Sequence, residues 1–271
     1  MPFTQVAVHW LRRLSGPAPR TSAGVPRPTV NNGWCPCCRS DSRFEETGPW
    51  LRDQYLCARC GSIPRFRALN LTLDTYFPGW EQRTIHESSP SNDFIRRYCE
   101  HYSSSYFFEG VPLGSPHNNS RCEDLERLTF PDDTFDLFVT QDVFEHVFRP
   151  DEALREIMRV VKPGGAHVFT APKHKGLRQT TQRAELRDGT IVHLLEPQYH
   201  GNPIGDGRSL VTWDYGDDFE TYLWSWCGYP TSTYIVRDRK LGLDGEYLEV
   251  FLTRKVALPS AQSPGQGHQR T

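Results

Sequence analysis

Residues 121–172 read RCEDLERLTFPDDTFDLFVTQDVFEHVFRPDEALREIMRVVKPGGAHVFTAP, and their pattern predicts the architecture of the main domain. Leu137-Phe138-Val139 is a short apolar run, typical of a strand that is buried on both faces of a parallel sheet. Apolar residues at helical spacing over 151–161 predict a helix, and Pro150 fits its first turn. The segment 162–165, KPGG, ends that helix, and the next strand is predicted at 166–170. This β-α-β unit predicts an open α/β sheet with a ligand crevice at the carboxyl ends of its strands.

The composition favours a protein with a sizeable core and without a general affinity for nucleic acid. Of 271 residues, 37% are hydrophobic and 12% are aromatic. The 31 Lys and Arg against 33 Asp and Glu give a net charge of −2, so the sequence lacks the basic surplus of nucleic-acid-binding proteins. No apolar run approaches the ~18 residues of a membrane-spanning helix, and residues 1–30 lack the apolar core of a secretory signal. We therefore expect a cytoplasmic protein that makes no membrane contact.

Both ends of the chain are predicted to be disordered tails, over residues 1–32 and 256–271. The first thirty residues contain four arginines and no acidic residue. Their composition is similar to that of a transit peptide, and it also fits a plain disordered tail rich in Pro, Arg and Ser. Residues 259–271 are polar and contain no core-forming residue.

Four of the eight cysteines have the spacing C-x2-C-x18-C-x2-C, at Cys35, Cys38, Cys57 and Cys60. Two such pairs let four thiolates converge on one zinc ion, so residues 33–62 are predicted to be a small zinc ribbon. Cys37 is a further thiol that could replace a neighbour as ligand. Two disulfides, or four reduced structural cysteines, are the alternatives. Four thiolates leave no open coordination position, which favours a structural role for the zinc.

A helix is predicted over residues 64–77, where it would pack the ribbon against the main domain. Arg65 and Arg67 lie on it and could face an anionic ligand, although a solvated helix face is the simpler interpretation.

Three segments resemble a known family: Glu123-Asp124-Leu125, LTFPDDTFDLFVTQDVFEHV and VVKPGGAHVFTAP. Together they resemble the second half of a class I S-adenosylmethionine-dependent methyltransferase of the type 11-like kind. The resemblance implies a Rossmann-like, doubly wound sheet with seven mostly parallel strands and a terminal antiparallel strand, over residues 63–255. It also implies S-adenosylmethionine as cofactor.

The resemblance also assigns the cofactor-binding residues. Asp124 would accept from the adenine amino group, with the backbone of Leu125 beside it, and Glu109 would hold the ribose hydroxyls at the end of the second strand. Glu87, Ser88 and Ser89 would form the first strand end and the cofactor loop, and Gln141 and Asp142 would end the fourth strand, where sulfonium and acceptor meet.

The predicted cofactor loop departs from the family pattern. The family has an acidic residue and then three glycines at alternate positions, whereas this chain has Glu87-Ser88-Ser89-Pro90. Serines are small, and Ser89 followed by Pro90 resembles the start of a helix, whose N-terminus would favour the cofactor carboxylate. A solvent-facing glutamate is the alternative interpretation of Glu109. An acid at a helix start or in a turn is the alternative for Asp124.

The acceptor side is predicted to lie in residues 173–216, a long polar segment that we expect to act as a lid over the crevice. His200 in this lid and His146 after the fourth strand are the candidate catalytic residues. His146 lies four positions after Asp142, so a helical segment would put a carboxylate beside this base. Structural histidines are the alternative for both. The chain then predicts a helix over 217–227 and a terminal β-hairpin from 233–236 and 247–253.

These observations predict methyl transfer to a small polar or glycan-like acceptor. The main alternative is a non-catalytic interaction protein that docks a partner through its zinc ribbon. A third hypothesis is an enzyme that modifies nucleic acid, against which the charge balance argues.

Overall fold

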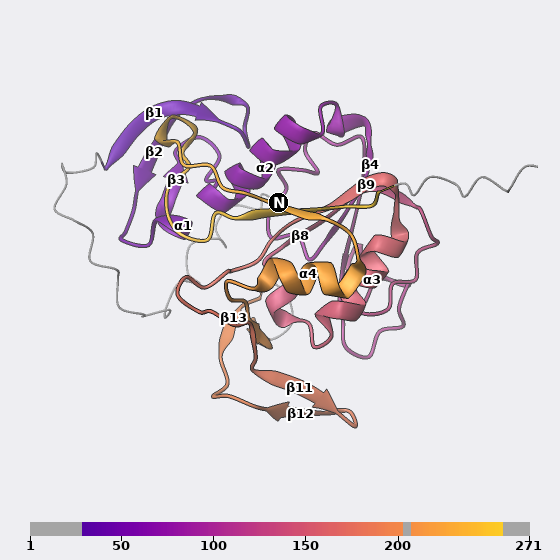
Figure 1. Ribbon diagram of the computed structural model, residues 1–271. Helices are drawn as coiled ribbons and strands as arrows, with labels where there is room; N and C mark the ends of the chain where they lie inside the picture. The colour runs from indigo at the N-terminus through magenta and orange to yellow at the C-terminus, as the bar shows by residue number, and fades with distance from the viewer. Residues whose placement is uncertain (1–28, 203–206, 257–271) are drawn as a thin grey trace, which may run out of the picture.

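The computed structural model describes residues 29–202 and 207–256, and one mixed β-sheet forms its centre (Figure 1). Most of the two predicted tails, residues 1–28 and 257–271, lies outside the described residues. Strand β1 (Val30–Cys35) begins within the segment that was expected to be the N-terminal tail.

The described residues form an eight-stranded central sheet in the order β16-β17-β9-β8-β4-β5-β7-β6. Its inner strands β4, β5, β7, β8 and β9 pair in parallel, and the outer pairs β16–β17, β17–β9 and β6–β7 are antiparallel. The predicted mostly parallel, Rossmann-like sheet is therefore confirmed, with the two-residue β6 at its edge. The strands are β4 (Thr84–Ser88), β5 (His101–Tyr106), β6 (Pro116–His117), β7 (Ser120–Cys122), β8 (Phe135–Gln141), β9 (Val161–Thr170), β16 (Thr231–Tyr234) and β17 (Val250–Arg254).

The KPGG segment opens β9 with an irregularity in its pairing to β8. The register shifts between Phe135 and Leu137, because residues 162–165 bulge out of the ladder. Gly164 has a φ of 83°, which favours glycine. A Cβ on Gly165 would lie 2.5 Å from the carbonyl oxygen of Asp136, so a side chain would push the two strands apart. Both glycines are therefore needed to bring the chain from the helix directly into the sheet.

Helices cover both faces of this sheet (Figure 1). Helix α2 (Pro64–Tyr76) packs on one face with Leu69 and Leu73, and α3 (Pro150–Val160) and α4 (Phe219–Cys227) pack on the other. Apolar residues recur at helical spacing in α3, and its buried side chains meet Phe138 and Phe169 of the sheet. Gly228 closes α4 with a φ of 70°. Among the described helices, none has the length and hydropathy that a membrane span requires.

The N-terminal module is a small three-stranded antiparallel sheet beside α2. It consists of β1, β2 (Ser40–Glu46) and β3 (Tyr55–Cys57), with the short helix α1 (Leu51–Gln54) before β3. Arg67 of α2 lies fully buried between this module and the main domain. Its guanidinium donates to the carbonyl oxygens of Ser62, Tyr55 (2.7 Å) and Gly242 (2.7 Å). The expectation of a solvated face is therefore wrong for Arg67, because its fork of donors binds carbonyls from three segments.

Residues 173–216 form a set of short antiparallel strand pairs at one end of the molecule. The hairpin of β11 and β12 projects away from the main body (Figure 1). The strands are β10 (Thr181–Gln182), β11 (Ala184–Arg187), β12 (Thr190–His193), β13 (Tyr199–Gly201), β14 (Arg208–Leu210) and β15 (Trp213–Asp214). Three 3₁₀ helices complete the description: η1 (Trp80–Gln82), η2 (Phe144–His146) and η3 (Arg239–Leu241).

A buried histidine in the sheet leads to a first prediction. His167 of β9 is fully buried, and burial lowers its pKa to about 3, below the ~6.5 of an unfolded chain. The neutral imidazole therefore stabilises the fold above pH ~6.5, and this contribution is lost as the pH falls toward 3. The free energy of unfolding falls as the pH is lowered through this window. In His167→Phe this fall is expected to be smaller by about 1.4 kcal/mol per pH unit.

Urea unfolding of both proteins at pH 7, 6, 5 and 4 measures this difference. Groups that titrate in both proteins cancel in the comparison. His193→Phe, on the exposed side of β12, is the control for replacing a surface histidine. Parallel pH curves for the unmutated protein and His167→Phe would contradict the prediction.

Candidate functional site

The carboxyl ends of β4 and β8 bring together the predicted residues Glu87 and Gln141. Glu87 is buried at the end of β4, where its carboxylate accepts from Gln141 Nε2 at 2.6 Å and from the Tyr102 hydroxyl at 2.8 Å. Burial raises the pKa of Glu87 to about 7, and the two hydrogen bonds oppose that rise. A buried acid held by two donors is a well-ordered polar group at the end of the sheet, where α/β folds bind their ligands.

Asp142, the next predicted residue, is a meeting point between the sheet and the N-terminal module. Its backbone has a φ of 52°, and its Oδ1 accepts from the Thr170 hydroxyl at 2.8 Å. Its Oδ2 forms ion pairs with Arg52 of α1 and Arg65 of α2. Burial would raise the pKa of Asp142, but the charges of the two arginines outweigh it and hold the pKa well below its usual range. Arg65 thus pairs with a carboxylate of the protein itself, and the hypothesis that it faces an anionic ligand stays a prediction.

The predicted cofactor loop does not start a helix. Ser88 is buried at the end of β4, whereas Ser89 has a φ of 54° and donates its N–H to the Ser105 carbonyl at 2.8 Å. Residues 90–100 form turns, in which the side chain of Asn92 accepts from the N–H of Phe94 at 3.1 Å. The prediction of a helix at Ser89-Pro90 is therefore wrong. The left-handed Ser89 and the local turn at Asn92 divert the chain, so no helix N-terminus faces the loop.

Glu109, Asp124 and Leu125 follow strands that run parallel to β4, which puts all of these residues at the same edge of the sheet. Glu109 lies exposed in a turn beyond β5. Asp124 Oδ1 accepts from the N–H of Glu126 at 2.9 Å, and Leu125 is buried in the core. Asp124 thus stabilises a turn, as its alternative interpretation expects. The hydrogen bond uses one of its two carboxylate oxygens.

The two candidate catalytic histidines lie together. The rings of His146 and His200 meet edge to face with centroids 5.0 Å apart, although one follows β8 and the other lies on β13 of the predicted lid. His146 Nδ1 bonds the Leu210 carbonyl at 2.8 Å. Burial lowers the pKa of His146, and it lowers that of His200 to about 4. The sequence interpretation did not include Glu145, whose buried carboxylate lies beside both rings.

The hypothesis that Asp142 orients His146 is corrected by these contacts. Segment η2 is a short 3₁₀ helix, in which positions four apart do not share one face. Asp142 instead faces Thr170 and the two arginines, and the Leu210 carbonyl orients His146.

The four predicted metal ligands converge in the N-terminal module. The thiols of Cys35, Cys38, Cys57 and Cys60 all lie within 4.8 Å of one another. Cys35 and Cys60 are 3.7 Å apart between sulfurs, and Cys38 and Cys57 are 4.0 Å apart. Sulfurs at ~2.3 Å from a tetrahedral ion are roughly 3.8 Å apart, so this donor set fits such an ion. Cys37 is buried beside the group but is not one of the four converging thiols, and all eight cysteines are free.

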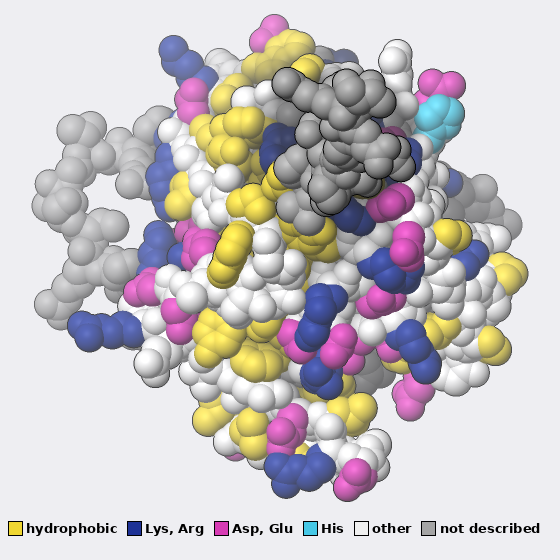
Figure 2. Space-filling model, turned by 45° about the vertical axis from the view of Figure 1, so that its right-hand side comes forward, with side chains coloured by type: hydrophobic (Ala, Val, Ile, Leu, Met, Phe, Trp, Pro, Cys, Tyr) yellow, Lys and Arg dark blue, Asp and Glu magenta, His cyan; other side chains and the backbone are white. Residues whose placement is uncertain are grey.

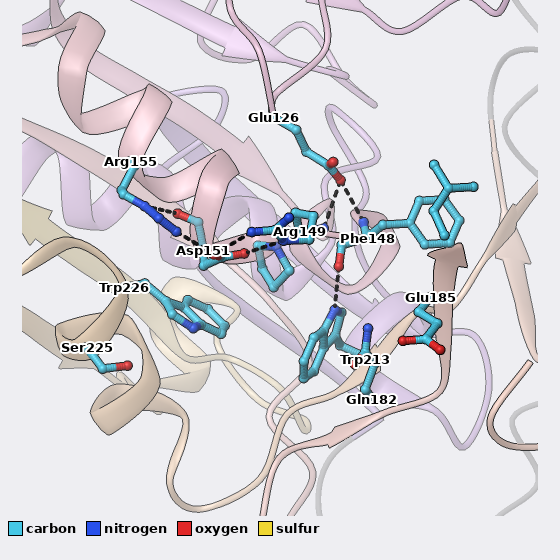
Figure 3. Close-up of a pocket in the computed structure, with 12 residues that line it drawn as sticks. Glu126, Phe148, Arg149, Asp151, Arg155, Gln182, Glu185, Trp213, Ser225 and Trp226 are labelled. Carbon is cyan, nitrogen blue, oxygen red and sulfur yellow. Dashed lines mark hydrogen bonds and ion pairs between the residues drawn. The ribbon is translucent and has the colours of Figure 1, made fainter. Parts of the chain in front are cut away.

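A separate open pocket lies between α3, α4 and the segment 173–216 (Figure 3). Trp213 and Trp226 line it with ring centroids 6.4 Å apart. Glu126 anchors the opposite wall by accepting from the backbone N–H groups of Phe148 (2.8 Å) and Arg149 (2.9 Å). None of the predicted cofactor residues lines this pocket, but residues 146–148 connect it to the histidine pair.

Comparison with known proteins shows what the central part of the chain is similar to. The sequence profile of a methyltransferase domain matches residues 100–169. An uncharacterized methyltransferase of Schizosaccharomyces pombe (strain 972 / ATCC 24843) is 35% identical over 105 residues, which are 34% of this chain and 33% of that protein. This chain therefore spans about a third of the length of the curated relative that it matches.

Solved structures similar to this chain include an S-adenosylmethionine dependent methyltransferase from Mesorhizobium loti, with 16% identity and a TM-score of 0.43 over 69% of this chain and 96% of the other. Another is the Burkholderia thailandensis 1,6-didemethyltoxoflavin-N1-methyltransferase, with 12% identity and a TM-score of 0.44. The match covers 72% of this chain and 79% of the other. The profile covers β5, β7, β8, α3 and nearly all of β9. Residues 100–169 of the α/β domain thus match the methyltransferase domain family, and a four-cysteine cluster at residues 35–60 precedes them.

Proposed function

We propose that this chain transfers the methyl group of S-adenosylmethionine to a small polar or glycan-like acceptor. The observation that carries the proposal is the polar group at the carboxyl ends of β4 and β8, Glu87 with Gln141 and Asp142, in a methyltransferase domain. Class I cofactors bind at this edge of the sheet, and the chemistry itself needs little more than alignment of the acceptor with the methyl group.

The cofactor would lie across the strand ends, with its adenine toward Asp124 and Leu125 and its ribose toward Glu109. Ser88 and Ser89 are small enough to let the cofactor approach the loop. Asp124 has an oxygen beyond the one that its own turn uses, and a carboxylate suits an exocyclic amine because it only accepts.

The acceptor class is supported by the pocket of Figure 3. Its two indole rings offer flat apolar faces of the kind that pack against the C–H faces of a sugar ring, while Glu126, Glu185 and Gln182 supply hydrogen-bonding groups around them. On the face seen in Figure 2, Lys and Arg side chains are interspersed with Asp and Glu. A mixed surface of this kind, with a net charge of −2, does not favour a nucleic acid as acceptor.

We also propose that Cys35, Cys38, Cys57 and Cys60 hold a structural Zn²⁺, and that residues 33–62 act as a ribbon attached to the domain 63–255. Four thiolates saturate a tetrahedral ion, so this zinc would stabilise the module rather than act on a substrate.

A second prediction tests cofactor binding. Asp124→Asn keeps the oxygen that accepts from Glu126 N–H, but it puts an NH₂ group where the adenine amine would donate. The affinity for S-adenosylhomocysteine is expected to fall by about 1–3 kcal/mol, because a buried donor of the ligand loses its acceptor. Glu109→Gln is expected to act in the same direction if the ribose assignment holds. Titration calorimetry with S-adenosylhomocysteine measures both.

The matched control is Asp188→Asn, in the exposed β11–β12 turn, where asparagine tolerates the φ of 51°. Unchanged affinity in both site variants would remove the placement of adenine and ribose. Failure of the unmutated protein to bind S-adenosylhomocysteine would favour the alternative function, a non-catalytic protein that docks a partner through its ribbon. The Ser89–Ser105 hydrogen bond, which occupies a backbone donor of the cofactor loop, is the observation that supports this alternative.

A further inference from the structure

Glu145, His146 and His200 converge on a common point beside the carboxyl end of β8. Their ligand-type atoms all lie within 4.8 Å of one another. Glu145 Oε1 is 3.8 Å from His146 Nε2 and 3.8 Å from His200 Nδ1. Oxygen and nitrogen ligands at ~2.0–2.2 Å from a metal ion are roughly 3–3.6 Å apart, so a slight closing of these three side chains would coordinate one ion.

The hydrogen bond of His146 determines which of its nitrogens is available. A carbonyl oxygen only accepts, so the 2.8 Å contact with Leu210 requires the proton of His146 to be on Nδ1. Nε2 then carries a free lone pair, and this is the nitrogen that faces Glu145. A ligating histidine commonly donates its other ring N–H to a carbonyl in this way, which fixes both the tautomer and the ring orientation.

Glu145 itself points to a missing partner. The residue is only 1% exposed, and its Oε2 has no hydrogen-bond partner among the described residues. The nearby arginines Arg52 and Arg65 pair with Asp142 instead. A buried carboxylate oxygen without a donor is costly, and a cation bound by both oxygens of Glu145 would remove that cost.

The backbone around the three residues is held in place by the lid. Thr212 donates its N–H (2.8 Å) and its hydroxyl (3.0 Å) to the Glu145 carbonyl, and the Tyr215 hydroxyl donates to the Phe144 carbonyl at 2.7 Å. These bonds tie the segment that carries Glu145 and His146 to the same insertion that carries His200. The backbone that carries Glu145 and His146 is therefore held in place by hydrogen bonds, as a metal site requires.

We infer that Glu145, His146 and His200 bind a divalent first-row transition-metal ion. Two imidazoles and one carboxylate are a ligand set for zinc and for non-haem iron, and three protein ligands leave coordination positions open. This site differs from the four-cysteine cluster, which leaves none. Binding of the ion depends only on the positions of these three side chains, whereas its role in methyl transfer rests on the proposed function.

In that role the ion would hold a hydroxyl oxygen of the acceptor and lower the pKa of the hydroxyl group. The acceptor oxygen loses its proton to solvent and forms the new C–O bond with the methyl group. The C–S bond breaks at the same time, and its electron pair stays on sulfur to give S-adenosylhomocysteine. The position next to Asp142 suits this role, because residues at the end of β8 lie where the cofactor and the acceptor would meet.

Co²⁺ titration of the full chain tests the site without any cofactor. The cysteine cluster is first loaded with Zn²⁺, and Co²⁺ is then followed by calorimetry and by its visible d–d absorption. We expect one saturable Co²⁺ site per chain, with no thiolate-to-metal charge-transfer band. His200→Gln and Glu145→Gln are each expected to lower the affinity for Co²⁺ by at least about 10–100-fold. Removal of a residue that only hydrogen-bonds a metal ligand already costs this much. His193→Gln, on exposed β12, is expected to leave it unchanged.

The unmutated protein provides a second readout that needs no variant. Bound Co²⁺ is expected to shift the ring-proton resonances of His146 and His200 far more than that of His193. Absence of a saturable Co²⁺ site in the zinc-loaded protein, or full affinity in a folded His200→Gln variant, would overturn the inference. Because S-adenosylhomocysteine is absent from this experiment, its failure is separate from a failure of the proposed methyl transfer.

Discussion

Replacement of Cys57 by serine is expected to release one zinc ion per chain and to unfold the three-stranded module. Serine does not supply a thiolate, and structural zinc contributes about 10–16 kcal/mol of apparent binding free energy in zinc-finger peptides. The module has little else to stabilise it. Its buried cluster consists of Cys35, Cys37, Phe44, Tyr55, Cys57 and Phe94, so half of these residues are cysteines. Metal analysis after gel filtration and amide hydrogen exchange over residues 30–62 measure the two effects.

Cys37→Ala is the matched control, because Cys37 is buried in the same cluster but is not one of the four converging thiols. This variant is expected to keep its zinc and most of the exchange protection, and loss of zinc from it would mean that Cys37 serves as a ligand. The predicted structural zinc would be refuted by an unmutated protein that is metal-free and nevertheless fully protected from exchange in this module.

The second large effect is expected from Arg67→Met. Methionine preserves much of the length of the side chain but supplies no donor, so the carbonyls of Tyr55 and Gly242 lose the guanidinium. The carbonyl of Ser62 loses it too but still accepts from the N–H of Cys57 at 3.0 Å. Each buried carbonyl left unpaired costs about 1–3 kcal/mol, and we expect the free energy of unfolding to fall by about 3–5 kcal/mol in total. The guanidinium also packs over the Phe44 ring, 4.9 Å from its centroid, which methionine only partly replaces.

Chemical denaturation of the zinc-loaded protein measures this loss. Arg67→Lys is expected to be intermediate, because one ammonium group cannot reach carbonyls on three segments with the geometry of a guanidinium. Arg43→Met is the control, since that side chain is 60% exposed on β2 and its replacement is expected to change stability by no more than about 0.5 kcal/mol. A loss below about 1 kcal/mol in Arg67→Met would show that the module is attached to the domain by other contacts.

The electrostatics of the crevice connect these two regions. Arg52 of the N-terminal module and Arg65 of α2 in the main domain both pair with Asp142, so both parts of the chain supply positive charge at the carboxyl end of β8. Both groups are largely shielded from solvent, so salt screens the interaction less than it would at the surface. Loss of zinc would therefore disturb the crevice through α1 as well as the module itself.

Local patterns in the sequence were sufficient to predict the centre of the fold. The apolar run at 137–139 and the helical spacing over 151–161 correspond to β8 and α3, because a strand buried on both faces and an amphipathic helix each leave a periodic signature in neighbouring residues. The two C-x2-C pairs likewise predicted that four thiols converge, since each pair spans one tight turn. The resemblance of residues 121–172 to methyltransferases then indicated the family.

The candidate site depended on contacts that no local pattern records. Arg52 lies 90 positions before Asp142, and His200 lies 55 positions after Glu145, so only the folded sheet and lid bring these charges together. The same reason explains the errors: Arg67 has the spacing of a surface residue, yet it is buried because the N-terminal module packs over it. At Ser89-Pro90 the sequence has the composition of a helix start, but a hydrogen bond to Ser105 on the adjacent strand holds Ser89 in a left-handed conformation. The sequence by itself was thus enough to predict the β-α-β frame and its resemblance to methyltransferases. Which side chains meet at the end of β8 depends on tertiary packing, because burial and pairing there involve segments far apart along the chain.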